Sequence, residues 1–147
     1  MKKEAIDFTE MPFGSMLSIA YRQIQGILRD PLSEFTLPAP LATVLWVIVE
    51  QPGRRQTYYA DACKIDLATF GRYLDTLSRR GLVTVEPDAE DGRAKLARPT
   101  SEGVALLYRI VEALKRTDKE FIELLGRDQF ERMREDLARF LENTKSL

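Results

Sequence analysis

The sequence contains no histidine and only one cysteine, Cys63, among its 147 residues. A single cysteine excludes an intrachain disulfide and gives no indication of an oxidising compartment. The sequence also lacks a glycine-rich phosphate loop, a cluster of metal ligands and a nucleophile paired with a base. We therefore expect no enzyme activity: no catalytic residue, no metal site and no cofactor.

Long apolar runs are missing as well. No stretch approaches the roughly 18 apolar residues of a membrane-spanning helix, and the N-terminal MKKEAIDFTE lacks the apolar core of a signal peptide. The sequence therefore predicts a cytoplasmic protein without a membrane partner. Its formal charge of −1 excludes a broadly basic nucleic-acid binder, although residues 54–98 hold nine Lys/Arg against seven Asp/Glu. This mild local excess permits DNA binding without establishing it.

Residues 57–98 carry the most informative pattern. Asp66 is a good N-cap for a helix over 66–80 that ends before Gly81. One face of this helix is apolar, with members at three- and four-residue steps: Leu67, Phe70, Leu74 and Leu77. Thr57 can cap a shorter helix that runs to Ala62. Residues 82–85 and 94–98 favour strands joined by a charged hairpin loop, which makes a helix-turn-helix with a wing.

This stretch resembles the MarR (multiple antibiotic resistance regulator) family of winged helix-turn-helix transcription regulators. The resemblance is carried by three segments in order: Leu77-Ser78-Arg79-Arg80-Gly81-Leu82-Val83, Pro87-Asp88-Ala89-Glu90-Asp91-Gly92-Arg93-Ala94-Lys95 and Pro99-Thr100-Ser101-Glu102-Gly103. Asp91-Gly92-Arg93 stands where the family has its Asp-x-Arg wing motif. The layout is similar over about residues 15–142, and the specific motifs lie within 57–103.

The rest of the chain favours helices over about 13–29, 41–50, 101–125 and 128–143. Asp30-Pro31 is expected to end the first of them. Apolar residues on the last are expected to face inward: Phe130, Met133, Leu137, Phe140 and Leu141. The fold class is mainly α with a small β-hairpin wing (α+β). We divide the chain into an N-terminal arm and dimerisation helix (1–35), a winged helix-turn-helix region (36–100) and C-terminal dimerisation helices (101–147).

The terminal helices carry more apolar surface than a core of about 60 residues covers, which marks an interface. The resemblance implies a homodimer formed by the first and the last two helices. Two recognition helices about one DNA turn apart, roughly 34 Å, would face a pseudo-palindromic operator in double-stranded DNA. The resemblance further implies a transcription regulator. We favour a repressor whose repression is relieved by a small, often aromatic, effector.

The candidate DNA-binding residues fall into three groups. Helix 66–80 would enter the major groove, where Arg72 can pair with guanine; its candidates are Ala68, Thr69, Arg72, Tyr73 and Arg79. The first backbone N–H groups of the short helix would hold a phosphate, at Gln56, Thr57 and Tyr58. The wing would contribute Arg93 in the minor groove, with Lys95 nearby and Asp91 orienting the wing through a salt bridge. The candidate phosphate contacts are Arg54, Arg55, Arg79, Lys95 and Arg98.

Simpler interpretations remain open for each group, since the helix face and the hairpin could both be ordinary solvated surface. Val85 stands where a wing arginine is common, Lys64 where a turn glycine is common, and Gly71 interrupts the recognition helix. The acidic wing and the missing arginine at the Val85 position favour, as an alternative, a winged-helix protein-interaction module that no longer binds DNA.

Two smaller hypotheses concern the interior. An effector could lie in a cleft lined by Tyr21, Ile24, Phe35 and Trp46, although aromatic residues at helical spacing are more often plain core. Cys63 could be a redox switch, but it stands where a buried, inert thiol is expected.

Overall fold

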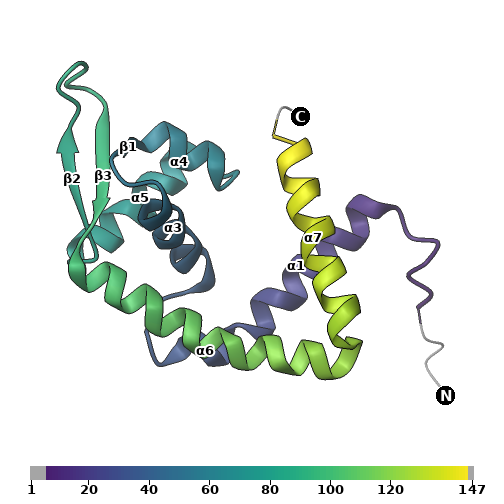
Figure 1. The fold of residues 1–147 in the computed structure, drawn as a ribbon. Coiled ribbons are helices and arrows are strands. Elements are labelled where there is room, and N and C mark those ends of the chain that lie inside the picture. Colours follow the sequence, from purple (N-terminus) through teal and green to yellow (C-terminus); the bar gives the residue numbers. More distant parts are fainter. Residues whose placement is uncertain (1–5, 146–147) are drawn as a thin grey trace.

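The computed structural model describes residues 6–145 as a helical protein with one small sheet (Figure 1). The helices are α1 (Phe13–Ile27), α2 (Arg29–Ser33), α3 (Ala39–Glu50), α4 (Gln56–Ala62), α5 (Leu67–Arg79), α6 (Ser101–Leu125) and α7 (Arg127–Asn143). The strands are β1 (Arg54–Arg55), β2 (Val83–Pro87) and β3 (Lys95–Pro99). The predicted fold class is confirmed. Residues 1–5 of the predicted polar N-terminus lie outside the described residues.

The sheet is antiparallel in the order β1-β3-β2. Val85 lies opposite Ala97 in the wing hairpin, and Arg54 pairs with Ala97 from the other side. We did not predict β1, because two residues carry no periodicity of their own and their pairing partner lies more than 40 residues away in sequence. Together with α3, α4 and α5 the sheet forms the winged-helix core.

The interior of this core is apolar. α3, α5 and β3 supply completely buried side chains, such as Leu45, Phe70 and Ala97. Figure 1 shows α6 leaving the foot of the wing and running to α7, which crosses α1 at the far end of the molecule. We call this far end, α1 with α7, the arm. The rings of Phe13 and Phe140 meet edge to face at 5.7 Å within it.

The boundary between α1 and α2 corrects one prediction. Asp30-Pro31 does not end the helical region, because Pro31 is the third residue of α2. A proline is tolerated there, since the first turn of a helix needs no N–H donor. The helix breaks at Leu28 instead, and the chain continues through α2 into residues 34–38, which we call the linker.

Other predictions need adjustment at single residues. Thr57 does not cap α4, because Arg55 occupies the N-cap position and Thr57 lies within the first turn. Leu67 is exposed although it was placed on the apolar face of α5; as the first residue of the helix it precedes the turns that pack on the core. On α7, Phe130 is buried, but Met133, Leu137 and Leu141 are about half exposed instead of facing inward.

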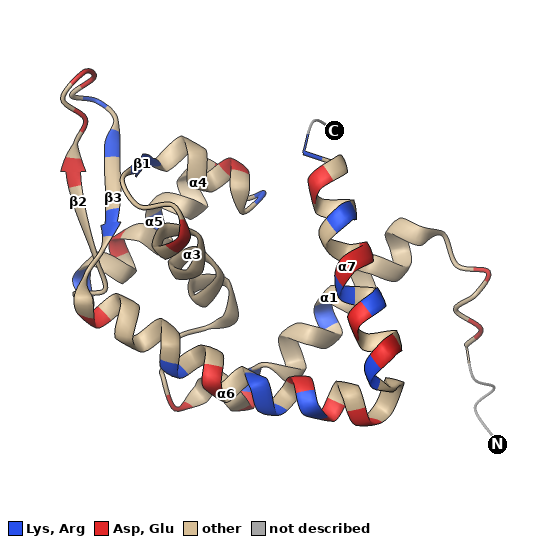
Figure 2. Ribbon diagram, viewed as in Figure 1, with Lys and Arg blue, Asp and Glu red and all other residues tan. Residues whose placement is uncertain are grey.

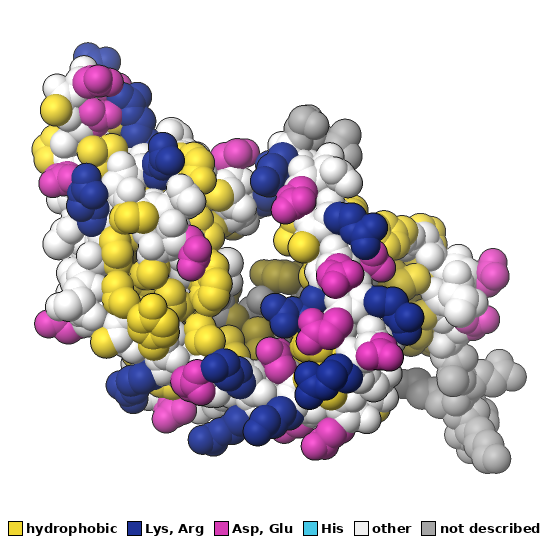
Figure 3. Space-filling view, in the orientation of Figure 1, with side chains coloured by type: hydrophobic (Ala, Val, Ile, Leu, Met, Phe, Trp, Pro, Cys, Tyr) yellow, Lys and Arg dark blue, Asp and Glu magenta, His cyan; other side chains and the backbone are white. Residues whose placement is uncertain are grey.

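Charged residues are distributed unevenly between the two ends of the molecule. Figure 2 shows blue and red residues alternating along the second half of α6 and along α7, while α3 and α5 are mostly tan. The space-filling view shows a broad apolar surface over the winged-helix core and an open hollow between the core and α7 (Figure 3). Within residues 6–145 we find no helix that is both long and apolar enough to cross a membrane.

Candidate nucleic-acid interface

Helix α5 begins as the sequence predicts. The Asp66 carboxylate accepts the backbone N–H of Thr69 at 2.8 Å and the Thr69 hydroxyl at 2.7 Å. These two hydrogen bonds, the side-chain bond first, hold the pKa of Asp66 below its usual 3.8. The cap is therefore ionised at neutral pH and fixes the first turn of the helix.

Arg72 is connected to this cap. Its guanidinium donates a hydrogen bond to the Thr69 hydroxyl at 2.9 Å, so that Arg72, Thr69 and Asp66 form a chain of contacts along one side of α5. Ala68 and Arg72 are exposed, Thr69 and Tyr73 are half-buried, and Arg79 is exposed at the last turn. The structure thus brings the predicted α5 residues to one surface, with a short side chain beside an oriented cation.

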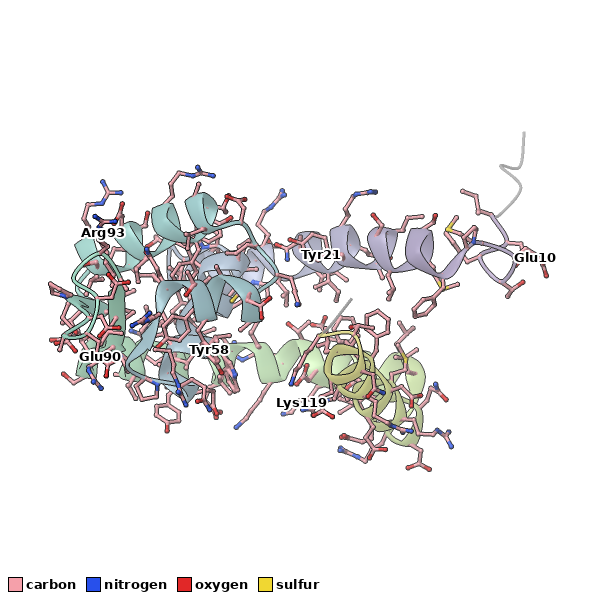
Figure 4. The ribbon with its side chains drawn as sticks, turned by 90° about the horizontal axis from the view of Figure 1, so that it is seen from above. Glu10, Tyr21, Tyr58, Glu90, Arg93 and Lys119 are labelled. Carbon is pink, nitrogen blue, oxygen red and sulfur yellow. The ribbon has the colours of Figure 1, made fainter. Side chains whose placement is uncertain are left out.

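The wing is held by a different set of contacts from the one predicted. The Asp91 carboxylate accepts the backbone N–H of Arg93 at 3.1 Å, and it has no ion-pair partner within residues 6–145, which corrects the expected salt bridge. Asp91 closes the turn instead. Figure 4 shows Arg93 and Glu90 at the wing end of the molecule, and Glu90 lines a groove together with Tyr58 of α4. Arg93 and Lys95 are both exposed.

Two wing acids are already engaged with arginines. Arg55 of β1 lies 2.5 Å from the Asp88 carboxylate through Nη2 and donates from Nε to the same oxygen at 2.6 Å. Arg98 and Glu86 pair at 3.0 Å. Because Arg55 and Arg98 already pair with carboxylates, they are weaker candidates for phosphate contacts. The same two pairs leave the wing with less unpaired negative charge than its sequence indicates.

The start of α4 faces the wing across a groove. The groove is lined by Gly53, Arg54, Arg55, Thr57, Tyr58, Asp88, Glu90 and Leu96. The Arg54 guanidinium lies 5.5 Å from the centre of the Tyr58 ring, a cation–π arrangement that keeps both side chains at the surface. Gln56 is half-buried, while Thr57 and Tyr58 are exposed. Thr57 and Tyr58 line this groove together with wing residues, and the phosphate contact of the first turn of α4 stays a prediction.

Tyr59 supports this arrangement and is missing from the predicted set. Its ring is completely buried, and its hydroxyl accepts the Arg54 N–H at 3.0 Å. The same hydroxyl lies 2.5 Å from the Gln51 carbonyl oxygen and 3.1 Å from that of Ala97. Burial is the main cause that raises the pKa of Tyr59. The hydroxyl therefore joins α3, β1 and β3, a role that only contacts distant in sequence reveal.

The predicted effector cleft is not formed by its four residues. Phe35 is 5% exposed and lies under Arg109 of α6, whereas Tyr21 is 60% and Trp46 46% exposed. Figure 4 shows Tyr21 on α1 between the core and Glu10 at the outer end of this segment. A cavity of about 400 Å³ lies instead between the end of α1, α2 and the start of α3, lined by Gln25, Arg29, Leu32, Ser33, Thr36, Leu37, Pro38, Ala39 and Pro40.

Cys63 follows α4 and is half-buried. Burial raises the pKa of its thiol above the usual 9.0. The thiol is therefore protonated near neutral pH, which supports the inert assignment over the redox switch.

Comparison with known proteins agrees with this geometry. Residues 36–94, which contain the winged-helix core up to the start of β3, match the sequence model of the MarR family. A Thauera aromatica protein named as a transcriptional regulatory protein for the hcr operon is 31% identical over 78 residues, which are 53% of this chain and 47% of that protein. The aligned part therefore spans about half the length of this relative.

Two solved structures extend the likeness to nearly the whole chain. The transcriptional repressor CouR, bound to a 23-mer DNA duplex, has a TM-score of 0.81 at 27% identity, over 92% of this chain and 98% of CouR. The PcaV transcriptional regulator from Streptomyces coelicolor, in complex with its natural ligand, has a TM-score of 0.74 at 25% identity, over 95% and 97%. The winged-helix region of this chain is therefore similar to the MarR family, and the chain as a whole has the fold of these two transcription regulators.

Proposed function

We propose that this chain is a homodimeric, sequence-specific DNA-binding repressor in the cytoplasm that releases its operator when a small effector binds. The observation that carries the proposal is the surface of α5, where Arg72 is oriented by Thr69 beside the exposed Ala68. An arginine held in this way can pair with the two acceptors of guanine in the major groove. The DNA duplex bound to the similar CouR supports the same partner.

The wing and α4 supply the contacts that carry no sequence information. Arg93 and Lys95 are exposed cations at and beside the hairpin tip, suited to the negative potential of a narrow minor groove. The first turn of α4, at Gln56, Thr57 and Tyr58, is the proposed backbone contact. Asp91 acts through the turn that presents Arg93.

The dimer part of the proposal rests on the arm. Met133, Leu137 and Leu141 follow one another at four-residue steps on α7 and are about half exposed. In the single chain nothing covers this row among the described residues, and a second copy would bury it. The proposed division into an N-terminal dimerisation segment (1–35), a winged-helix region (36–100) and C-terminal dimerisation helices (101–147) follows from this use of the two ends.

The effector part is supported by the natural ligand of the similar PcaV and by the cavity beside the linker. A volume of about 400 Å³ suits a small molecule. Arg29 and Gln25 supply polar groups there, and Leu32 and Leu37 supply apolar ones.

Selection of bound duplexes from a random pool, followed by binding measurements on variants, tests the proposal. Arg72→Ala should lose about 1–3 kcal/mol of preference for the selected site. Arg93→Ala should weaken binding to selected and unrelated duplexes alike, with a salt slope smaller by about one. Arg132→Ala, on exposed α7, is the control. If Arg72→Ala and Arg93→Ala both bind as the wild type does, the assigned surface is wrong.

The protein-interaction module remains the second candidate, favoured by the exposed acids Glu90 and Asp91 at the wing tip and by Val85, which is half-buried in the strand. The salt dependence of binding separates the two functions. A DNA-binding protein loses affinity for a duplex steeply as salt rises, whereas an interaction module shows no such binding to lose.

A further inference from the structure

The linker between arm and core adopts a strained conformation. Thr36 has φ +49°, a value that β-branched residues rarely adopt because it brings the side chain too close to the backbone. Such a conformation persists only where the surroundings hold it. The backbone N–H groups of Phe35 and Thr36 donate to the carbonyls of Leu32 and Ser33, each at 3.1 Å, which closes the end of α2 but does not reach the core.

Phe35 and Leu37 of the linker are buried in the hydrophobic core, and a polar contact is added by the residue that follows α5. Arg80, which follows α5 directly, donates from Nη1 to the Thr36 carbonyl at 2.8 Å and from Nη2 to the Phe35 carbonyl at 2.9 Å. Both acceptors lie more than 40 residues earlier in the chain. The fixed fork of a guanidinium suits two adjacent carbonyls, and charge-assisted bonds are stronger than neutral ones.

A second arginine closes the linker from the opposite side. The Arg109 guanidinium of α6 lies 5.3 Å from the centre of the Phe35 ring, which is almost fully buried. The linker is therefore held between the end of α5 and the side of α6. It also forms a wall of two cavities, since Thr36 lines the one beside α1 and Phe35 lines a groove along α6.

We propose that Arg80 is a positioning residue that couples the arm to the recognition helix, so that a change in the linker is transmitted to α5. Its two hydrogen bonds are the described polar contacts that join the end of α5 directly to the chain entering from the arm. A molecule that enters the cavity beside α1 and shifts Thr36 thereby moves the acceptors of Arg80. The consequence for DNA rests on the proposed function, but the coupling itself is a property of the isolated protein.

Arg80→Met tests the coupling on the full chain, because methionine keeps the apolar stem and removes every donor. Arg80→Lys keeps a cationic donor without the fork, and Arg132→Met on α7 is the control for loss of an arginine. Amide exchange at Phe35 and Thr36 should become about tenfold faster in Arg80→Met, with a smaller rise in Arg80→Lys and no change in the control. Amides in the middle of α5 should keep their protection, which shows that the variant is folded.

A distance measurement then separates coupling from local packing. Spin labels at Ala20→Cys on α1 and Asp75→Cys on α5, in a Cys63→Ser background, report the arm-to-helix distance. Dilution with unlabelled protein leaves only pairs within one chain. We expect a distance distribution that is broader or shifted in Arg80→Met and unchanged in Arg132→Met.

The outcomes are distinct. Unchanged amide exchange at Phe35 and Thr36 overturns the proposal. Faster exchange with an unchanged distance distribution also overturns it, because Arg80 would then stabilise the linker only locally. Neither measurement contains DNA. A wild-type protein that binds no duplex would therefore defeat the proposed function and leave the test of Arg80 intact.

Discussion

Arg55 and Asp88 are 33 residues apart in sequence, and the Asp88 carboxylate joins them by receiving two guanidinium nitrogens on one oxygen. The other carboxylate oxygen accepts the backbone N–H of Glu90 at 2.9 Å. This N–H bond first, and Arg55 next, hold the pKa of Asp88 below its usual 3.8. Asp88 is therefore ionised near neutral pH, where DNA binding is normally measured, and its ion pair with Arg55 connects the wing to β1.

Replacing Asp88 by Asn should release Arg55 while keeping an acceptor for the Glu90 amide. One negative charge near the duplex is lost and one arginine becomes available for phosphate. We expect tighter binding to unrelated DNA at low salt and a slope of log affinity against log salt that is steeper by about one. Glu112→Gln, which breaks an ion pair with Lys115 on α6, is the control, and an unchanged slope in Asp88→Asn would contradict the role given to Arg55.

Two glycines should respond in opposite directions to alanine. At Gly103 a Cβ atom would collide with the Leu82 carbonyl, whereas at Gly71 it would meet nothing within 4 Å. Gly103→Ala should lower the free energy of unfolding by about 1–3 kcal/mol, and Gly71→Ala, within α5, should raise it by about 1 kcal/mol. Denaturant titrations of both variants measure the difference. A stable Gly103→Ala protein would mean that α6 does not pack against Leu82 so closely.

The proposed dimer depends on the apolar row of α7. Leu137→Glu places a charge in the middle of that row, next to Met133 and Leu141, and should convert a dimer into a monomer at micromolar concentration because an unpaired charge is costly to bury. Sedimentation analysis reports the mass directly. Arg134→Glu, which makes an equal or larger charge change on the same helix, should leave the dimer intact; dissociation of both variants alike would argue against a specific apolar interface.

The reactivity of Cys63 should show its burial. Because burial raises its pKa above 9.0, the folded protein should react slowly with iodoacetamide near neutral pH, and the rate should climb only at alkaline pH. Protein unfolded in urea should react faster at every pH in this range. Rapid alkylation of the folded protein below neutral pH would restore the redox switch as a hypothesis.

Local signals in the sequence account for the parts of the structure that were predicted well. Asp66 and Gly81 mark the ends of α5 because a cap and a left-handed glycine act within a few residues. Lys64 is a further case: it stands where a turn glycine is common, and its φ of +52° shows that the position does require the left-handed conformation.

Contacts between distant segments account for the parts that were missed. No periodicity in the sequence relates the residues that make three of these contacts. They are the pairing of β1 with β3, the hydrogen bond of the Tyr59 hydroxyl to Ala97, and the hydrogen bond of Arg80 to Phe35. The effector cleft failed for the same reason: Tyr21 and Ile24 do share a helix, but their distance from Trp46 is set by how α1 meets the core. The type of a side chain indicates which interactions it can make. Only the tertiary arrangement determines which residue it makes them with.

The close approach of Gly103 to Leu82 has a mechanical result. Thr100 donates its backbone N–H to the Leu82 carbonyl at 3.0 Å and its hydroxyl to the Gly81 carbonyl at 2.6 Å, so that the start of α6 is attached to the residues that directly follow α5. With 25 residues, α6 is about 38 Å long. A tilt of α6 by about 5° therefore displaces one end by about 3 Å relative to the other, close to the roughly 3.4 Å rise of one base step. In the proposed dimer, a tilt of this size would put the two α5 helices out of phase with the base sequence.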